Sequence, residues 1–444
     1  MKKLFQTIQN IFSIEDLRIR ILNTFGYLII FRLGSFIVLP GVDPNALAKG
    51  VGTQGILGFI DTFVGGAFSH LSVFALGIMP YISASIVLQL LTFAVPQFQK
   101  MQKEGESGRK KIDQITRWLT IAIAAAQGIS YIQGLVSPDM LLPGINMGAF
   151  TIWALFAIVA GTMFTMWIGE KITEKGIGNG ISMLIMIGII SRLPQALAKE
   201  AYSKGLSQGF FFVIELVILF FIVMGVVMLT KATRKIPVQY AKQIVGNKVY
   251  GGQRQYIPLK VIAAGVMPII FAQSIMFIPA LAAGFWRDTS NLASSLGAVF
   301  SDFTTWQYNV VFAIMIIVFT FFYTALTVNP NQISDDMKRN GGFIPGIKPG
   351  KDTSEFIDGV LSKITLPGSI FLAMVAIFPA IAHKVGVSRD FSYFYGGTSL
   401  LILIGVVLDT LDQLNSYLLM RHYEGMMQSG RFRERSASEI KMKS

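Results

Sequence analysis

The 444-residue sequence has no cysteine and few charged residues. Asp, Glu, Lys and Arg make up 14% of it, whereas soluble domains carry about 25%, and this deficit argues against a soluble multidomain enzyme. Without cysteine there is no disulfide, thiol nucleophile, thiolate metal ligand or iron–sulfur cluster. His70, His383 and His422 lie far apart and form no H-x3-H pattern, so no metal-binding histidine pair is evident.

The sequence is dominated by long apolar runs. We count ten stretches near the length of about 20 residues that a membrane helix needs: 21–39, 71–94, 116–136, 149–168, 180–198, 209–229, 262–284, 308–328, 364–386 and 397–418. The alternative is a set of core helices in a soluble protein, but the connecting segments are too short to build a polar shell around them. The sequence therefore predicts an all-α polytopic membrane protein with ten transmembrane helices.

The order of the stretches suggests two halves of five helices. Residues 1–20 read as a cytoplasmic amphipathic segment at the membrane interface, followed by a first span that is retained rather than cleaved as a signal peptide. Spans 1–5 occupy 21–198, spans 6–10 occupy 209–418, and 419–444 form a basic cytoplasmic tail. With five spans in each half, the second is inverted relative to the first, as in many transport proteins. The inversion is inferred from the number of spans alone, because the two halves show no repeat in their residues.

The positive charge lies on one side of the membrane. The termini and the connections on their side carry 30 of the 38 Lys and Arg residues, and the opposite side carries 7. Cytoplasmic segments carry the excess of Lys and Arg in membrane proteins, so both termini are predicted to be cytoplasmic. The net charge of +13 then needs no nucleic-acid-binding domain to explain it.

Two basic cytoplasmic segments, 230–260 and 329–363, are long for a compact membrane protein. They follow spans 6 and 8 and are rich in turn residues. They are either solvated loops that meet anionic lipid head groups or a docking platform for a large acidic or RNA-bearing partner. The residues alone do not separate these two interpretations.

Few residues in the spans could bind an ion, bind a phosphate or transfer a proton. No phosphate-binding loop is present. Asp409 and Asp412 in span 10 are either a cation site or a pair at a helix end that meets the basic face. Glu215 in span 6 and Arg32 in span 1 are either coupling residues of a carrier or groups that snorkel or pair structurally.

Two apolar features stand out. Ile82 and Ile86 in span 2, and Ile181, Ile185 and Ile189 in span 5, recur every fourth residue and so form single-face stripes. Such stripes are either ordinary core and lipid contacts or, if several face one axis, a hydrophobic constriction. Residues 55–68 are apolar but too short to span. They predict a re-entrant helix that ends at Gly65-Gly66.

Five segments resemble one family. Phe74–Ile86 is similar to the second span of the SecY family, the central channel subunit of the bacterial Sec protein translocon, and Lys103–Lys110 is similar to the loop after it. Gly176–Ser182 is similar to the start of the fifth span, and Pro345–Gly350 and Gly396–Ile402 to later signatures. The likeness runs from about Ile14 to Gly425.

The resemblance implies a passive protein-conducting channel with an hourglass pore. Such a channel passes unfolded secretory polypeptides across the cytoplasmic (inner) membrane and releases membrane-protein helices sideways through a lateral gate. The implied pore ring is Ile82, Ile86, Ile181, Ile185, Ile270 and Ile402. The implied plug is Gly55, Ile56, Leu57, Phe59, Ile60, Phe63, Val64, Gly65, Gly66 and Phe68. Gln127, Gln273 and Ser274 match gate positions, where ordinary interhelical hydrogen bonding is an equally good explanation.

The resemblance also implies partners and no cofactor. The partners are the SecE and SecG subunits, the ribosome through its RNA, the SecA ATPase, the nascent or unfolded polypeptide, membrane lipid, and the accessory proteins YidC and SecDF. The cytoplasmic docking residues are Arg234, Lys235, Lys242, Lys248, Arg254, Lys338, Arg339, Lys348 and Lys351. Lys348 stands where the family often has Arg, and Asn247 precedes Lys248 where basic pairs are common. Lys cannot form the bidentate hydrogen bonds of Arg. Of all the residue roles that the resemblance implies, docking by these residues is therefore the least secure.

Two other classes of protein remain for comparison. A secondary transporter of a small solute needs a polar site near the membrane midplane and a site for a coupling ion. An intramembrane enzyme needs a nucleophile, a metal set or an acid–base pair, and the chain offers none of these. We therefore expect no enzymatic activity.

Overall fold

A computed structural model of the protein describes residues 14–43, 61, 64–136, 138–205, 209–240, 243–245, 248–250, 254–285, 299 and 302–441. Residues 1–13 of the predicted interfacial segment and most of the predicted re-entrant helix lie outside these residues, and residues 15–20 are the start of the helix Glu15–Gly34.

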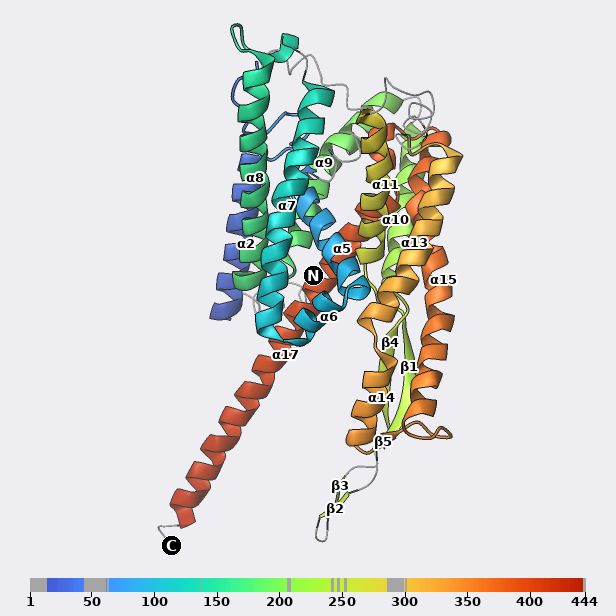
Figure 1. The fold of residues 1–444 in the computed structure, drawn as a ribbon. Coiled ribbons are helices and arrows are strands. Elements are labelled where there is room, and N and C mark those ends of the chain that lie inside the picture. The colour runs from blue at the N-terminus through green and yellow to red at the C-terminus, as the bar shows by residue number, and fades with distance from the viewer. Residues whose placement is uncertain are drawn as a thin grey trace.

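Helices make up most of the structure (Figure 1). The first group is α2 (Glu15–Gly34), α5 (Met79–Ala94), α6 (Pro96–Lys103), α7 (Glu106–Leu135), the short 3-10 helix η1 (Pro138–Met140), α8 (Met147–Lys175) and α9 (Gly180–Lys204). The second group is α10 (Gly209–Lys231), α11 (Met267–Phe285), α13 (Trp306–Thr327), α14 (Pro330–Arg339), α15 (Lys351–Lys384), α16 (Arg389–Ser392) and α17 (Gly397–Lys441).

A helix lies over each of the ten predicted spans. Among the described residues, six helical segments are long and apolar enough to cross a membrane: α8, α9, α10, Trp306–Arg339, α15 and Gly397–Leu419. A seventh candidate is α5 together with α6, which turn by 99° at their junction. Pro96 stands at the start of α6, where its missing N–H leaves no hydrogen bond unmade. The chain is therefore a multi-pass helical membrane protein.

The helices form two packed groups that meet along two seams. Within the first group α8 contacts α2, α7 and α9, and within the second α13 contacts α11 and α15. The groups meet where α11 contacts α5 and α7, and again where α9 contacts α10 and α17. Figure 1 shows α2, α7 and α8 on one side of the molecule and α11, α13 and α15 on the other. We call the contact of α5 and α7 with α11 and α13 the front seam.

A small sheet joins the two long basic segments, which the sequence analysis treats as loops. Strand β1 (Thr233–Tyr240) pairs antiparallel with β4 (Arg254–Lys260) and with β5 (Gly342–Phe343), and β2 (Gln243–Val245) pairs with β3 (Lys248–Tyr250). Ile236, Val238, Leu259, Met337 and Ile344 form a separate hydrophobic cluster beneath this sheet, with Ile357 and Leu361 of α15. The membrane part is all helical, as predicted, and the basic segments form one structured unit.

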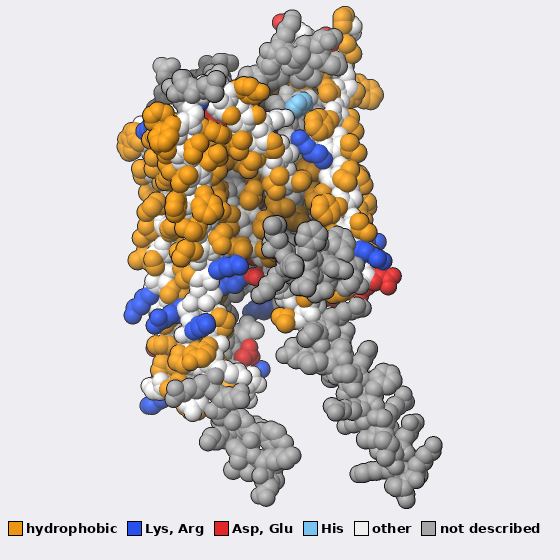
Figure 2. Space-filling model, turned by 180° about the vertical axis from the view of Figure 1, so that it is seen from behind, with side chains coloured by type: hydrophobic (Ala, Val, Ile, Leu, Met, Phe, Trp, Pro, Cys, Tyr) orange, Lys and Arg blue, Asp and Glu red, His pale blue; other side chains and the backbone are white. Residues whose placement is uncertain are grey.

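The outer surface matches a lipid environment. Figure 2 shows hydrophobic side chains over most of the middle of the rear face, with most of the visible Lys and Arg below them. Large side chains such as Phe25, Phe156 and Phe210 are 61%, 71% and 75% exposed. Exposed apolar surface of this extent is typical of membrane or partner contact.

Glycine allows one close approach in the first group. A Cβ atom at Gly161 of α8 would lie 2.1 Å from the carbonyl oxygen of Val73, which is far inside van der Waals contact. At Gly26 of α2, by contrast, no heavy atom lies within 4 Å of such a Cβ.

We therefore expect Gly161→Ala to destabilise the protein and Gly26→Ala to leave it unchanged or slightly more stable. Overpacking of this kind costs about 1–3 kcal/mol, whereas removing backbone freedom from the unfolded chain at a compatible site stabilises by up to about 1 kcal/mol. Thermal unfolding of the two purified variants in detergent, each against the unchanged protein, checks this. Equal transition temperatures for both variants would contradict the close packing at Gly161.

Candidate functional site

Four of the six isoleucines assigned to the pore ring surround one small cavity. Ile82 of α5, Ile185 of α9, Ile270 of α11 and Ile402 of α17 line it. All four are at most 9% exposed. The cavity measures about 10 Å³, roughly the room that one water molecule needs. Two of the isoleucines come from each helical group, so the two groups close on each other here.

The remaining two isoleucines belong to the same apolar cluster without lining the cavity. Ile86 is 4% exposed and lies one helical turn beyond Ile82, and Ile181 is half-buried against the cluster one turn before Ile185. This four-residue spacing places each pair on one face of its helix. The structure thus brings all six residues into one core.

The predicted gate residues do not bond to one another. Gln273 is 6% exposed and donates to the hydroxyl of Tyr308 at 3.4 Å, within the second group. Ser274 donates to the carbonyl of Ile270 in its own helix at 2.9 Å. Gln127 is half-buried on α7, and the described part of the chain shows no hydrogen bond from its side chain. Gln273 and Ser274 instead line the isoleucine cavity, together with Thr398.

A hydrogen bond that the sequence analysis missed crosses the front seam. The Tyr323 hydroxyl of α13 donates to Oε1 of Gln89 of α5 at 2.8 Å. Gln89 in turn donates to Ser85 at 3.3 Å. The Tyr323 ring packs edge-on against Phe271 of α11, with 5.1 Å between ring centroids. Gln89 and Tyr323 are 234 residues apart and belong to no motif that we recognised, so no sequence signal was available.

The described end of the predicted plug turns sharply at its two glycines. Gly65 and Gly66 have φ angles of +68° and +96°, which side chains disfavour. Val64 and Phe68 are 2% and 3% exposed, and the Tyr131 hydroxyl of α7 donates to the carbonyl of Phe68 at 2.7 Å. The expected break at the glycine pair is confirmed. Gly55, Ile56, Leu57, Phe59, Ile60 and Phe63 lie outside the described residues.

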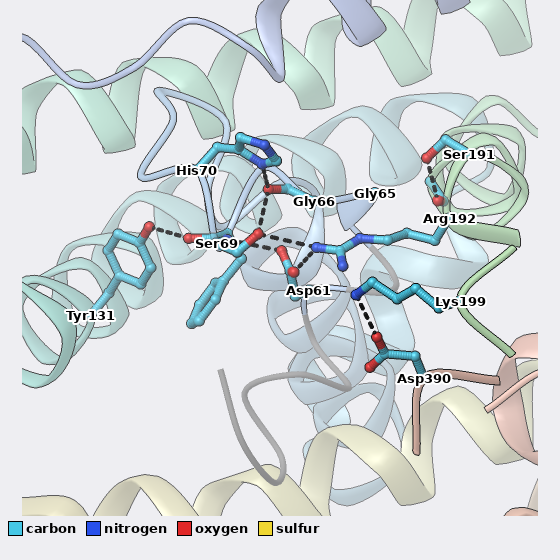
Figure 3. Close-up of polar contacts among 12 residues, drawn as sticks. Asp61, Gly65, Gly66, Ser69, His70, Tyr131, Ser191, Arg192, Lys199 and Asp390 are labelled. Atoms are coloured by element: carbon cyan, nitrogen blue, oxygen red, sulfur yellow. Dashed lines mark hydrogen bonds and ion pairs between the residues drawn. The ribbon is translucent and has the colours of Figure 1, made fainter. Parts of the chain in front are cut away.

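Two arginines hold this segment from neighbouring helices. Arg32 of α2 donates to the carbonyl of Gly65 at 2.5 Å. Arg192 of α9 forms an ion pair with Asp61, whose side chain is 1% exposed, and donates to Ser69 at 3.1 Å (Figure 3). Asp61 also accepts from the backbone N–H of Ser69 at 2.9 Å. We call Asp61, Ser69 and Arg192 the plug anchor. The structural pairing proposed for Arg32 is confirmed, whereas the partner of Asp61 was not predicted.

The glycine-rich motif 176–182 builds the start of α9. The side chain of Asn179 caps the helix by accepting from the backbone N–H groups of Ile181 at 3.1 Å and Ser182 at 3.3 Å. Gly178 has a φ of +81° and donates to Gln413 of α17 at 2.9 Å. The motif therefore fixes the entry of α9, and with it the positions of Ile181 and Ile185.

The ionisable residues of the spans are paired rather than gathered at the midplane. Glu215 pairs with Lys204, and Lys260 lies 4.0 Å from Asp412. These contacts confirm the structural interpretation of Glu215 and the contact of the Asp409–Asp412 helix end with the basic face. Within the described residues, no group of three or more His, Asp or Glu side chains is arranged to hold a metal ion.

The basic residues assigned to docking lie around the small sheet. Arg234 and Lys235 are exposed on β1, and Lys338, Arg339, Lys348 and Lys351 are exposed on and beside α14 and β5. Hydrogen bonds hold this region together: Ser334 donates to the carbonyl of Gly350 at 2.6 Å, and Thr353 to that of Lys348 at 2.8 Å. The side chains of Lys242, Lys248 and Arg254 fall outside the described part. We refer to these six exposed residues of one structured unit as the basic surface. Arg234 and Lys235 are consecutive in β1 and so point to opposite faces of the strand, and Lys351 lies 3.7 Å from Glu355.

Comparison with known proteins supports the resemblance. The sequence model of the SecY family matches residues 72–411. The protein translocase subunit SecY of Thermotoga maritima is 40% identical over 448 residues, which cover 97% of this chain and all of the relative. The Synechocystis subunit is 40% identical over 433 residues, covering 95% and 97%.

Solved structures share the fold. A protein-conducting channel superposes with a TM-score of 0.65 at 17% identity, covering 90% of this chain and 92% of the other. Sec61 from a canine ribosome–channel complex superposes with a TM-score of 0.61 at 15% identity, covering 90% and 92%. The family model and the near-full-length identity decide the assignment: the chain belongs to the SecY family.

Proposed function

We propose that this chain is a protein-conducting channel that passes unfolded polypeptides across the cytoplasmic membrane and releases apolar helices sideways into lipid. The observation that carries the proposal is the isoleucine cavity, which two groups of helices close with two side chains each. Aliphatic side chains attract a passing chain without direction or sequence preference. They also resist water and ions when the groups are together. The relative from Thermotoga maritima, which is named a protein translocase subunit, supports the same activity.

The energy for transport comes from partners, since we found no nucleotide-binding motif in the sequence. Binding of the ribosome or the SecA motor at the basic surface around β1 and β5 agrees with its positive charge, and a ribosome-bound Sec61 shares the fold. SecE and SecG complete the channel in this proposal, with YidC and SecDF as accessory proteins. Both termini are placed in the cytoplasm by the distribution of Lys and Arg. A solute transporter is disfavoured, because Glu215 and Arg32 are engaged structurally.

Site-specific cross-linking tests the pore directly. A photoreactive residue is placed in turn at Ile86, Ile185 and Ile402, and a secretory chain is stalled in membrane vesicles. We expect adducts with the stalled chain at all three positions, because each side chain faces the closed core. The matched control is Ile190 of α9, which is 38% exposed, and there we expect adducts with lipid instead. If the stalled intermediate is present and the three positions give no adducts, the pore assignment is wrong.

The plug anchor favours the closed state in this proposal. Asp61 is buried, at 1% exposed, and pairs with Arg192, which is 25% exposed. Removing one partner leaves the other charge without its counter-ion, and because Arg192 is partly solvated the cost is less than the about 3–5 kcal/mol of a fully buried pair. The predicted plug segment, which contains Asp61, is thus fixed to α9 as long as the pair is intact.

We expect Asp61→Asn to raise the ion leak of reconstituted, idle channels and to admit precursors with weakened signal sequences. The charge exchange Asp61→Arg with Arg192→Asp should restore most of the seal, whereas each single reversal should leak more than the amide. Ion flux across vesicles gives the measure. Glu170→Gln is the control, because Glu170 of α8 pairs with Arg117 of α7 at 2.9 Å, within the first group and outside the anchor. Equal leak from Asp61→Asn and the control would remove the anchor's role in closure.

Opening of the lateral gate must break the bond between Tyr323 and Gln89, because it joins α13 of one group to α5 of the other. Hydrogen bonds between membrane helices contribute on average about 0.6 kcal/mol. That energy shifts a two-state gate by roughly threefold in favour of the open state when the bond is lost.

Tyr323→Phe should therefore raise the translocation of a precursor with a weakened signal sequence about threefold. Tyr308→Phe is the matched control. It removes a hydroxyl from the same helix whose partner, Gln273, belongs to the same group, so opening does not break that bond. The ratio of weak-signal to normal-signal translocation in vesicles separates gating from general damage. Equal ratios for both variants would show that Tyr323 does not hold the gate.

A further inference from the structure

A second cavity lies on the outer side of the second helical group. It is an open pocket of about 390 Å³ between α10 and α15, at the end of α15 away from the sheet, and it is larger than the isoleucine cavity. Its walls are apolar and include Phe211, Ile214 and Ile218 of α10 and Phe378 and Ile381 of α15. Phe211 and Ile381 are 60% and 48% exposed. The pocket thus opens on a surface that suits lipid.

One end of this outer pocket carries an unbalanced ionic cluster. Lys204 of α9 pairs with Glu215 of α10 and lies 3.2 Å from Glu200 of α9. The three side chains are only 10%, 12% and 1% exposed. Two carboxylates against one ammonium leave one net negative charge in a place where water is scarce. Such a charge is costly unless a cation accompanies it or one carboxylate takes up a proton, and a bound cation removes the cost without that proton.

Several buried polar atoms at this end form no hydrogen bond within the described part of the chain: Oε1 of Glu200, Oε2 of Glu215, the hydroxyls of Ser388 and Tyr395, and Nε of Arg389. Of these residues, Glu215 and Tyr395 line the pocket, and Tyr395 is 2% exposed. The other oxygen of Glu200 already accepts from the backbone N–H of Ser388 at 3.0 Å. The charged side chains beside the cluster are also occupied, since Lys199 pairs with Asp390 and Arg389 with Asp302. The vacant positions can therefore be satisfied by a ligand that brings a cation with N–H donors.

We propose that the outer pocket binds one phospholipid whose head group carries a primary ammonium, as in phosphatidylethanolamine. The ammonium balances the cluster and donates to Glu215 and Tyr395, while an acyl chain lies along the apolar walls of α10 and α15. A choline head group carries the same charge without N–H donors, and a glycerol head group carries no positive charge. The pocket therefore selects ethanolamine over both.

The test is lipid retention by the purified channel complex, measured by native mass spectrometry. The complex is incubated with equal amounts of dioleoyl phosphatidylethanolamine, phosphatidylcholine and phosphatidylglycerol. We expect the unchanged protein to retain one ethanolamine lipid with a preference of about tenfold over choline, the factor that one charge-assisted hydrogen bond supplies. Glu215→Gln keeps the shape of the side chain and should abolish that preference. Glu170→Gln, which removes an acid of α8 that pairs with Arg117 at 2.9 Å and does not line the pocket, should keep it.

Thermal unfolding distinguishes a variant that has lost lipid binding from one that is misfolded. Ethanolamine lipid should raise the transition temperature of the unchanged protein and of Glu170→Gln, through binding to the folded state, and not that of Glu215→Gln. Equal retention of ethanolamine and choline lipids, or undiminished ethanolamine preference in Glu215→Gln, would overturn the proposal. So would a preference for phosphatidylglycerol, since an anion cannot balance the cluster. None of these readouts depends on translocation.

Discussion

The closure between the two helical groups has to exclude water and still come apart, and apolar contact is the interaction that permits both. Ile82 and Ile185 from one group meet Ile270 and Ile402 from the other around a cavity with room for about one water. Aliphatic contact has no preferred direction, so the side chains can reorganise as the groups separate. A closure built of polar groups alone would offer ions a path, whereas here four isoleucines close the cavity, with Gln273, Ser274 and Thr398 beside them.

Polar contacts between the groups are distributed unevenly. At the front seam, one hydrogen bond joins Tyr323 to Gln89. At the end of α9, Lys199 pairs with Asp390, Glu200 accepts from Ser388, and Lys204 pairs with Glu215. The plug anchor, by contrast, lies wholly within the first group. Separation of the groups is therefore cheapest at the front seam, while the end of α9 acts as the fixed side, which is the arrangement of a hinge.

The sequence predicted the helices well because hydrophobic runs of membrane length have few alternative structures. It also indicated Ile82 and Ile185, through helical spacing and family likeness. The sheet was missed because β1 and β4 are charged and each contains a proline, and β1 pairs with β5 across a long stretch of sequence. Contacts such as Gln89 with Tyr323 and Asp61 with Arg192 depend on tertiary packing alone. A single polar residue in an apolar helix predicts that it has a hydrogen-bond or ion-pair partner, but the sequence does not identify that partner.

The sheet explains how the basic surface can be connected to the front seam. Strand β5 follows α14, which continues α13 after two residues, and α13 carries Tyr323. Strand β1 follows α10 directly, and its cluster includes Ile357 and Leu361 of α15. A partner bound to this surface therefore contacts rigid extensions of the second group rather than mobile loops. Because only two extended residues, Val328 and Asn329, separate α14 from α13, a tilt imposed on α14 has a short path to the bond between Tyr323 and Gln89.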